Sequence, residues 1–461
     1  MTTEQVYSIL RDKLGESKIV KPKAGELKYF TAQSAALVPA VQVFPENAKE
    51  VSTVLQVAQD LQIPFAVKAG GHGVYSGASS IEGGILIDLS RINAVEVAPD
   101  RTSVSIGAGA KWGDVYGKLD QMGISVPGGR ISTVGVGGLT LGGGISFAAS
   151  RYGLACNNVK SYEVVLADGK IVSVTHETHP DLFWALRGAG TNFGIQYLED
   201  SETRAIALLD TFCKSQDPSS SSADADAEAF IITAYVAPMA RFITTAVLSH
   251  GKPEDDPPVF DGFTALPSIA SSTKIRSIAN LSVELNANNP HGLRSKTLAL
   301  AVKSDVKILT GVLEIYKEVI SPHQDTVINF VPAILLQPLL PRMLPASGSE
   351  HALGLTREDG PLFVVSLLWS WTEPSDDALI ESLAHDFAGR VTATATAQDK
   401  FHRYIYLNYA AGDQDVFASY GKENLERLVQ VSREYDPNGV FSKLRPGYIK
   451  VARGRQPNGD T

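Results

Sequence analysis

Cysteine is scarce in this sequence, and long apolar runs are missing from it. The 461 residues include only two cysteines, Cys156 and Cys213, which excludes a disulfide framework and any cysteine-rich zinc or iron–sulfur site. No stretch reaches the ~18–20 consecutive apolar residues that a membrane-spanning helix needs. The first ten residues contain no basic region followed by an apolar one. We therefore predict no secretory signal, no membrane partner and a cytoplasmic location.

The charge balance of the chain is acidic. Lysine and arginine number 41, against 50 aspartate and glutamate residues, which gives a formal net charge of −9. Such a surface repels phosphate backbones, so the composition argues against nucleic-acid binding. The hydrophobic fraction of 44% and the charged fraction of 20% are ordinary for a globular protein. A chain of this length is expected to form two or three domains.

Several common active-site signatures are missing as well. The sequence contains no G-x-G-x-x-G dinucleotide fingerprint, no P-loop and no G-x-S-x-G nucleophile elbow. His176 and His179 lie one residue closer together than the two histidines of a zincin motif. We therefore predict a polar loop at these histidines and no metal site.

Glycine is abundant and unevenly distributed. Of 40 glycines, 24 lie between Gly70 and Gly194. Ordered glycine costs conformational entropy, so this density favours a backbone that turns sharply or touches a ligand. A β-rich region with many tight turns is the alternative, and it is the better explanation of any single glycine.

The first 195 residues have the pattern of mixed helices and strands. Asn47 can cap a helix, and Glu50 three residues later completes a capping box. A short apolar strand over 63–69 runs directly into a glycine-rich loop. Two strands over 162–166 and 171–174 flank an Asp-Gly turn, which predicts a hairpin.

The character of the chain changes after this region. A polar stretch, 196–204, leads into a long segment of mixed strands and helices, and the tail holds one strand and a helix over 423–435. We therefore predict an α+β protein of two domains. The first domain consists of residues 1–204 and is completed by the C-terminal segment 404–461, and the second consists of residues 205–403.

Five glycine- and tyrosine-rich segments carry the strongest functional signal. The first, residues 70–77, reads Gly-Gly-His-Gly-Val-Tyr-Ser-Gly and follows a predicted strand. Its successive backbone N–H groups, with little side-chain bulk, can hold a pyrophosphate without a Rossmann helix. The others follow in the order 127–144, 151–159, 181–195 and 406–441.

In this order and spacing, the segments resemble the FAD-linked oxidases of the vanillyl-alcohol oxidase superfamily. The closest likeness is to the berberine-bridge-enzyme-like branch with its 6-hydroxy-D-nicotine-oxidase-like proteins. The resemblance implies a PCMH-type FAD-binding domain and a substrate domain built on an antiparallel sheet. It further implies an oxidoreductase that passes hydride from a small organic substrate to FAD, with dioxygen as the expected electron acceptor. The likeness to fungal oxidases suggests a tailoring step in secondary metabolism.

The resemblance also assigns cofactor-binding residues. His72 matches the histidine that bonds to the flavin 8α-methyl group, and Ile131 stands where a second, cysteine link occurs in bicovalent relatives, so a single covalent link is expected. The other implied positions are Gly70, Gly71, Gly73, Val74 and Gly77 at the pyrophosphate, Gly137, Gly138 and Gly142 at the flavin and ribityl chain, Gly153, Leu154 and Ile195 at the adenine half, and Asn408 at the flavin.

For catalysis, the resemblance points to Tyr409. In several relatives this tyrosine removes a proton from a substrate hydroxyl or phenol. Free tyrosine has a pKa of ~10, so it needs a partner or the field of the flavin to act near neutral pH. The alternative is that Tyr406, Asn408 and Tyr409 only line a buried strand.

One departure from the family leaves the function open. After Ile195 the sequence lacks the alternating apolar pattern that the family has there, so up to roughly two or three strands of ~5–6 residues are missing. The chain is then either an active oxidase or a catalytically impaired flavin-binding protein. A third possibility is a cyclase or pericyclase in which FAD only shapes the pocket.

Overall fold

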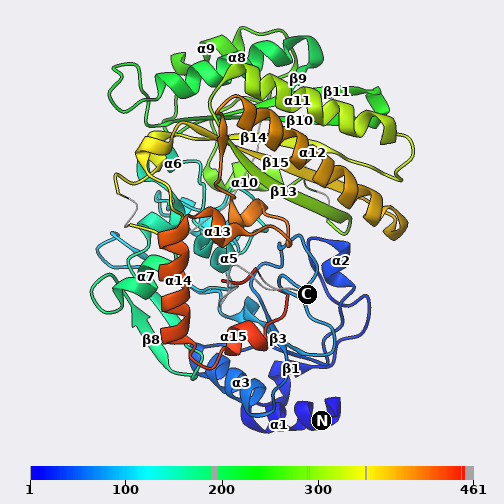
Figure 1. Cartoon of the computed structure of the whole chain (residues 1–461). Coiled ribbons are helices and arrows are strands. Elements are labelled where there is room, and N and C mark those ends of the chain that lie inside the picture. Colours follow the sequence, from blue (N-terminus) through cyan, green and yellow to red (C-terminus); the bar gives the residue numbers. More distant parts are fainter. Residues whose placement is uncertain are drawn as a thin grey trace.

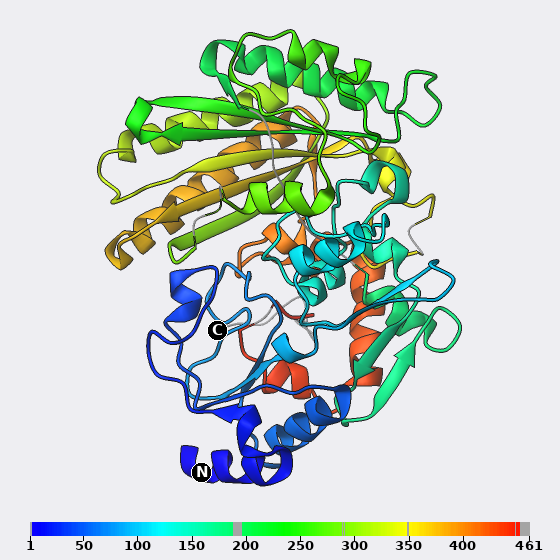
Figure 2. The same cartoon turned by 180° about the vertical axis from the view of Figure 1, so that it is seen from behind.

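One large sheet fills the upper half of the molecule in Figure 1, and smaller sheets make up the lower half. The views from the front and from behind (Figures 1 and 2) show the same division. This computed structural model describes residues 2–187, 196–287, 289, 291–347, 350–447 and 449–451.

The lower half begins with a four-stranded sheet in the order β1-β2-β4-β3. Strands β2 and β3 run parallel to β4, and β1 is antiparallel to β2. Helices α1 and α3 cover this sheet, since Leu10, Val54 and Leu55 share one buried cluster with its side chains. The bounds are α1 (Thr3–Leu14), β1 (Ile19–Val20), β2 (Val41–Val43), α3 (Ala48–Asp60), β3 (Phe65–Lys68) and β4 (Ile85–Asp88).

The predicted start of α3 is confirmed, but its capping differs in one detail. The backbone N–H of Glu50 donates to Oδ1 of Asn47 at 3.0 Å, as expected of an N-cap. The Glu50 carboxylate accepts from the backbone N–H of Glu46 at 3.0 Å. This carboxylate therefore does not accept from the backbone N–H of Asn47, and the predicted capping box is wrong.

Two antiparallel pairs of strands and several short helices complete the lower half. Gly169 turns the β7–β8 hairpin with φ +80°, the left-handed conformation that the Asp-Gly pair predicts, so this hairpin is confirmed. The bounds are α2 (Ala32–Ala35), β5 (Val95–Val97), β6 (Val104–Ile106), α4 (Trp112–Asp120), α5 (Val136–Leu141), α6 (Ala149–Tyr152), β7 (Tyr162–Val165), β8 (Ile171–Val174) and α7 (Pro180–Ala185).

The upper half is built on an antiparallel sheet in the order β12-β9-β11-β10-β14-β15-β13-β16. Successive side chains of a strand point to opposite faces, so each long strand presents residues both to the helices and to the lower half. The bounds are β9 (Gln196–Leu198), β10 (Ala227–Val236), β11 (Arg241–His250), β12 (Ser268–Ala270), β13 (Arg294–Lys303), β14 (Ala333–Leu339), β15 (Leu362–Trp371) and β16 (Phe401–His402).

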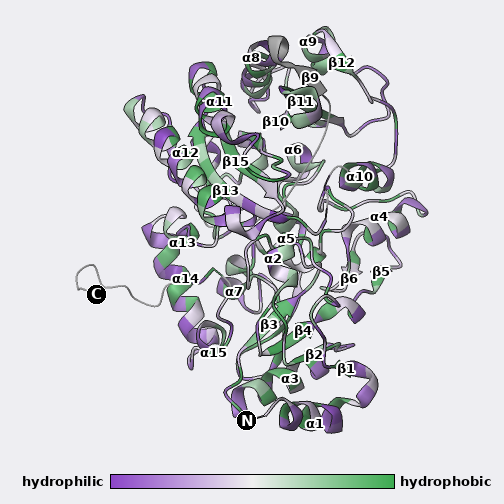
Figure 3. Cartoon of the chain, turned by 90° about the vertical axis from the view of Figure 1, so that its right-hand side faces the viewer, coloured by the Kyte–Doolittle hydropathy of each residue, from purple (hydrophilic) through white to green (hydrophobic). Residues whose placement is uncertain are grey.

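Helices α8, α11 and α12 cover one face of the large sheet (Figure 1). The central strands between these helices and the lower half are strongly hydrophobic (Figure 3), and Phe363, Leu367 and Trp369 of β15 are fully buried. None of the helices in the described residues combines the length and apolar character needed to cross a membrane. The bounds are α8 (Glu199–Ser215), α9 (Asp261–Thr264), α10 (Ile278–Ala287), α11 (Val306–Ile320) and α12 (Asp377–Ala397).

The C-terminal tail returns to the lower half, where α14 runs beside α7 (Figure 1). Nε of Arg427 donates to Asp181 at 3.0 Å, and the backbone N–H of Phe65 donates to the carbonyl of Leu444 at 2.6 Å. The strand predicted within the tail is wrong, because residues 407–409 form a 3₁₀ turn. The bounds are α13 (Val416–Ser419), α14 (Lys422–Tyr435) and α15 (Val440–Lys443).

The predicted α+β class is confirmed by this arrangement. Helix α8 runs across the predicted boundary at residue 204, and β9 pairs with β11 and β12 of the large sheet. We therefore propose that the second domain begins at β9 and ends with β16, and that residues 404–447 belong with the lower half.

Candidate active site

The glycine-rich loop 70–77 follows β3 and packs directly on other backbone. A Cβ atom on Gly70 would lie 2.3 Å from the backbone nitrogen of Gly135, and one on Gly73 would lie 2.6 Å from the Cβ of Ala78. Gly71 and Gly77 have φ values of +70° and +84°, which L-residues with side chains rarely adopt. Glycine is thus required here by close approach and by conformation.

His72 lies in this loop between two aromatic rings. Its ring stacks on Phe30 at 4.6 Å between centroids and meets His291 edge-on at 5.6 Å. Its Nε2 atom lies 2.8 Å from Oγ1 of Thr133. Burial, together with the charges of His291 and Lys111, lowers the pKa of His72 to about 3. The imidazole is therefore neutral at physiological pH and keeps a lone pair for bond formation.

The predicted cofactor glycines of segment 135–144 lie within helix α5 or at its end. Gly137 and Gly138 lie within the helix and Gly142 ends it. A Cβ atom on Gly138 would meet nothing within 4 Å, so this side of α5 is open to a ligand. Asn408 donates from Nδ2 to the carbonyl of Leu139 at 3.5 Å. Segment 130–145 therefore joins the His72 loop to the returning C-terminal tail.

Tyr409 is only 4% exposed and closes the 3₁₀ turn 407–409, so it does not line a strand. Its ring meets that of Tyr406 edge-on at 4.8 Å, and the Tyr406 hydroxyl accepts from the backbone N–H of Ile145 at 3.4 Å. Burial raises the pKa of Tyr409 above its ordinary value, and the charge and a hydrogen bond of Arg130 oppose this rise. Arg130 is therefore the positively charged partner of Tyr409, but the effect of burial on the pKa is the larger one.

Arg130 lies in a buried polar cluster beneath the large sheet. Its side chain is fully buried, with Nη2 donating to Oε1 of Gln337 on β14 at 2.8 Å. Nη1 lies 3.9 Å from Oε2 of Glu228 on β10, and the guanidinium covers the ring of Phe230 at 4.7 Å. Burial raises the pKa of Glu228 to about 7, which the Arg130 charge opposes. The sequence assigned no role to these residues, although Glu228 is the only charged residue of β10 and Gln337 the only polar residue of β14.

Of the three residues predicted at the adenine half, two lie in the described part of the chain. Gly153 has φ +72° and follows α6. Leu154 is 1% exposed in the main hydrophobic core, and its N–H donates to Oδ1 of Asn157 at 3.0 Å. Ile195 lies outside the described residues. The assignment of these positions to the adenine half stays a prediction.

Two cavities adjoin the candidate site. The larger, about 1710 Å³, lies between the β5–β6 and β7–β8 pairs and touches Gly137 and Thr140 of α5. It exceeds the ~300–1,000 Å³ of a typical small-molecule pocket. The smaller, about 220 Å³, lies between the His72 loop at Val74 and Tyr75 and the large sheet at Thr297. Of these two cavities, only the smaller one touches the His72 loop.

Neither cysteine is placed or activated for a second covalent link. Both thiols are buried, and burial raises the pKa of Cys156 to about 12 and that of Cys213 well above its ordinary value. Both are therefore protonated and unreactive at neutral pH. Ile131, at the position of the second link in relatives, is 5% exposed.

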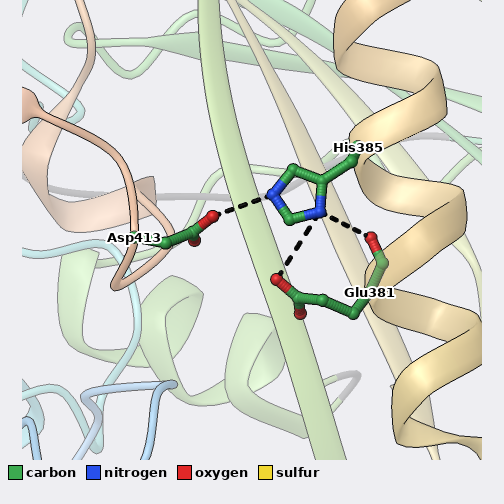
Figure 4. A group of neighbouring side chains, drawn as sticks. All are labelled: Glu381, His385 and Asp413. Atoms are coloured by element: carbon green, nitrogen blue, oxygen red, sulfur yellow. Dashed lines mark hydrogen bonds and ion pairs between the residues drawn. The ribbon is translucent and has the colours of Figure 1, made fainter. Parts of the chain in front are cut away.

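In the described part of the chain, one group of three side chains has the spacing of metal ligands (Figure 4). Nε2 of His385 lies 2.8 Å from Asp413, and Nδ1 lies 3.8 Å from Glu381. The ammonium of Lys296 lies 2.5 Å from the same Glu381 carboxylate and 3.7 Å from Asp413. A cation of the protein itself thus neutralises these carboxylates, and we interpret the group as an ion-pair network between α12 and the tail.

Comparison with known proteins agrees with this geometry. The FAD binding domain model matches residues 39–175, and the berberine and berberine-like model matches residues 405–443. The FAD-dependent monooxygenase FUP4 of Fusarium proliferatum is 34% identical over 476 residues, covering 93% of this chain and 88% of that protein. The FAD-dependent monooxygenase tpcD of Cochliobolus heterostrophus is 34% identical over 470 residues, covering 92% and 87%.

Two solved structures share the fold. The 6-hydroxy-D-nicotine oxidase of Arthrobacter nicotinovorans has a TM-score of 0.73 at 19% identity, covering 96% of this chain and 98% of that one. The glucooligosaccharide oxidase of Acremonium strictum has a TM-score of 0.74 at 19% identity, covering 96% and 99%, and carries a 6-S-cysteinyl, 8α-N1-histidyl FAD.

The residues of this chain fit the same cofactor. The His72 loop offers a neutral imidazole and glycine backbone, α5 offers an open face at Gly138, and both lie beside the returning tail. FAD is thus the cofactor, as the sequence predicted. The chain belongs to the FAD-linked oxidoreductases of the berberine-bridge-enzyme-like branch of the vanillyl-alcohol oxidase superfamily.

Proposed function

We propose that this chain is an FAD-linked oxidase that removes a hydride and a proton from a small organic substrate with an alcohol or phenol group. The observation that carries this proposal is the buried contact between Tyr409 and Arg130 beside the α5 glycines. FAD bound to His72 supplies the acceptor for the hydride. We also propose that dioxygen reoxidises the flavin and that the reaction is a tailoring step in secondary metabolism.

The chain's own residues handle the proton. Tyr409 takes the proton from the substrate hydroxyl, because it is the tyrosine of the tail segment that is hydrogen-bonded to Arg130, next to Asn408, which is tied to α5. Arg130 stabilises the anionic tyrosine, which is otherwise disfavoured by burial. The hydrogen bond from Arg130 to Gln337 and the neighbouring Glu228 hold the guanidinium against the sheet.

A monooxygenase is the second candidate, favoured by the names of the relatives FUP4 and tpcD. The two reactions differ in the fate of dioxygen. An oxidase returns both oxygen atoms as hydrogen peroxide, whereas a monooxygenase transfers one atom to the product. Turnover under ¹⁸O₂ of any substrate that bleaches the flavin anaerobically separates them, and ¹⁸O in the product would reject the oxidase.

The absorption spectrum of the purified protein tests the proposal before a substrate is known. We expect a flavin spectrum in the native protein and a yellow pellet after acid precipitation, because the cofactor is covalently held. A colourless protein would count against the proposed FAD-linked oxidase. Turnover without any change in flavin absorbance under anaerobic conditions would favour the cyclase.

Arg130→Met is expected to shift the pH dependence of flavin reduction. Removal of an adjacent positive charge raises a buried pKa by about 1–3 units, so Tyr409 would be deprotonated only at higher pH. Reduction at a fixed pH below this pKa should then slow by about tenfold or more. Anaerobic stopped-flow measurements from pH 6 to 10 follow the shift. Arg130→Lys keeps the charge, so its rate of flavin reduction should lie between those of the wild type and Arg130→Met. An unchanged pH profile in Arg130→Met would show that Arg130 takes no part in the proton transfer.

A further inference from the structure

A chain of two hydrogen bonds connects His72 to the upper half of the molecule. Nε2 of His72 lies 2.8 Å from Oγ1 of Thr133, and this oxygen lies 2.5 Å from Oδ1 of Asn286 on α10. We propose that Thr133 and Asn286 are positioning residues that fix the tautomer of His72 and leave its Nδ1 atom free to bond with the flavin. This inference rests on the proposed attachment of FAD to His72.

The direction of the two hydrogen bonds follows from the chemistry of the groups. The Asn286 Oδ1 atom only accepts, so the single hydroxyl hydrogen of Thr133 must point to it. The Thr133 oxygen can then only accept from the imidazole, which places the ring hydrogen on Nε2. A neutral imidazole carries one ring hydrogen, so Nδ1 of His72 keeps its lone pair.

The surroundings keep the ring neutral and hold its plane. Burial lowers the pKa of His72 to about 3, so protonation does not occupy Nδ1 at physiological pH. Phe30 stacks on the ring with an interplanar angle of 18°, and His291 meets it edge-on. Within the described residues Nδ1 has no hydrogen-bond partner, whereas Nε2 does. The relative from Acremonium strictum is bonded at histidine N1, which is the Nδ1 atom.

Asn286 makes this arrangement depend on the packing of the two halves. Helix α10 lies on α4, where the backbone N–H of Ala279 donates to Asp120 at 3.4 Å. The backbone N–H of Ser132 donates to the carbonyl of Ser282 at 3.2 Å. The segment that contains Thr133 is thus tied to α10 next to the relay, so the reactive tautomer is set once α10 has docked.

The covalent step balances with dioxygen as the oxidant. A bond would form between Nδ1 and the 8α carbon of the flavin, and one C–H bond at that carbon would break, with its hydrogen leaving as a proton. The electron pair of this bond passes to the flavin ring, and the hydrogen of Nε2 leaves as a proton through Thr133. Dioxygen then removes the two electrons with two protons as hydrogen peroxide, which restores the oxidised flavin.

The test compares the ratio of covalent to released flavin in purified variants. Denatured chains are weighed by mass spectrometry, and the released FAD is measured by its fluorescence. Thr133→Val should lower the ratio of covalent to released flavin, because the loss of one orienting hydrogen bond slows attachment roughly tenfold. Thr133→Ser keeps the hydroxyl and should match wild type. Asn286→Leu should behave like Thr133→Val, and Asn286→Asp, which only accepts, should restore attachment.

Two outcomes separate this inference from the proposed attachment site. Covalent flavin at the wild-type ratio in both Thr133→Val and Asn286→Leu would overturn the relay and leave His72 as the attachment site. Covalent flavin in His72→Ala would instead overturn the attachment site itself. If Thr133→Val binds no FAD, the ratio of covalent to released flavin in Asn286→Leu tests the relay instead, because Asn286 acts on the His72 ring through Thr133.

Discussion

Tyr409→Phe is expected to slow reduction of the bound flavin by a factor of about 10²–10⁴, the usual contribution of a general base. The substitution removes only the hydroxyl, and the buried ring that packs on Tyr406 keeps its place. Burial raises the pKa of Tyr409, so the wild-type rate should rise with pH through the alkaline range. In the variant this rise should vanish. Anaerobic stopped-flow spectroscopy of the flavin measures both effects.

Tyr406→Phe is the matched control for this measurement. Tyr406 is equally buried, and its hydroxyl accepts one hydrogen bond from the backbone of Ile145. Its loss should cost stability of about 1 kcal/mol but should leave the pH dependence of flavin reduction intact. An unchanged rate in Tyr409→Phe would remove this residue from the mechanism and direct attention to Glu228, the buried carboxyl group on β10.

The cofactor loop could be predicted from sequence because its signal is local. Gly70, Gly71 and Gly73 follow an apolar strand directly, and the reason for each glycine is a close approach of neighbouring atoms or a left-handed φ value. The same holds for the β7–β8 hairpin at Gly169. Patterns of this kind are complete within a few residues, so a single sequence contains all the information they need.

The polar cluster around Arg130 could not be predicted in this way. Arg130 and Gln337 are separated by 207 residues and meet only when the large sheet packs on the lower half. The conformation of the tail could not be predicted for a related reason. The tyrosines Tyr406 and Tyr409 favour a strand, but residues 407–409 form a 3₁₀ turn. Tyr406, just before this turn, is hydrogen-bonded to Ile145, and Tyr409 contacts Arg130. Tertiary contacts overrode the local preference.

The missing segment after Ile195 stays a prediction, and two observations support it. The match to FUP4 runs over 476 residues, more than the 461 of this chain, so that relative has internal residues without a counterpart here. Strands β6 and β7 each pair with a single partner in the described residues, and the cavity of about 1710 Å³ lies between them. Additional strands would pair with these edges and fill the cavity. The two strand pairs alone leave it open, and isolated two-stranded sheets are only marginally stable.

His72→Ala is expected to abolish covalent flavin completely while leaving the glycine backbone that holds the pyrophosphate. Ile131 provides no second link, and both cysteines are buried and protonated. Any FAD in the variant should therefore be released into the supernatant by acid precipitation. Absorbance of pellet and supernatant gives the partition, and the mass of the denatured chain confirms that it carries no flavin.

His291→Ala is the control that separates bonding from packing. His291 contacts the His72 ring edge-on but has no place in the hydrogen-bond chain through Thr133. Its removal should leave covalent flavin at the wild-type level, and it should raise the pKa of His72 slightly, because the His291 charge lowers that pKa. A yellow pellet from His72→Ala would show a bond at another residue. Loss of covalent flavin in both variants would mean that the packing around the imidazole limits attachment.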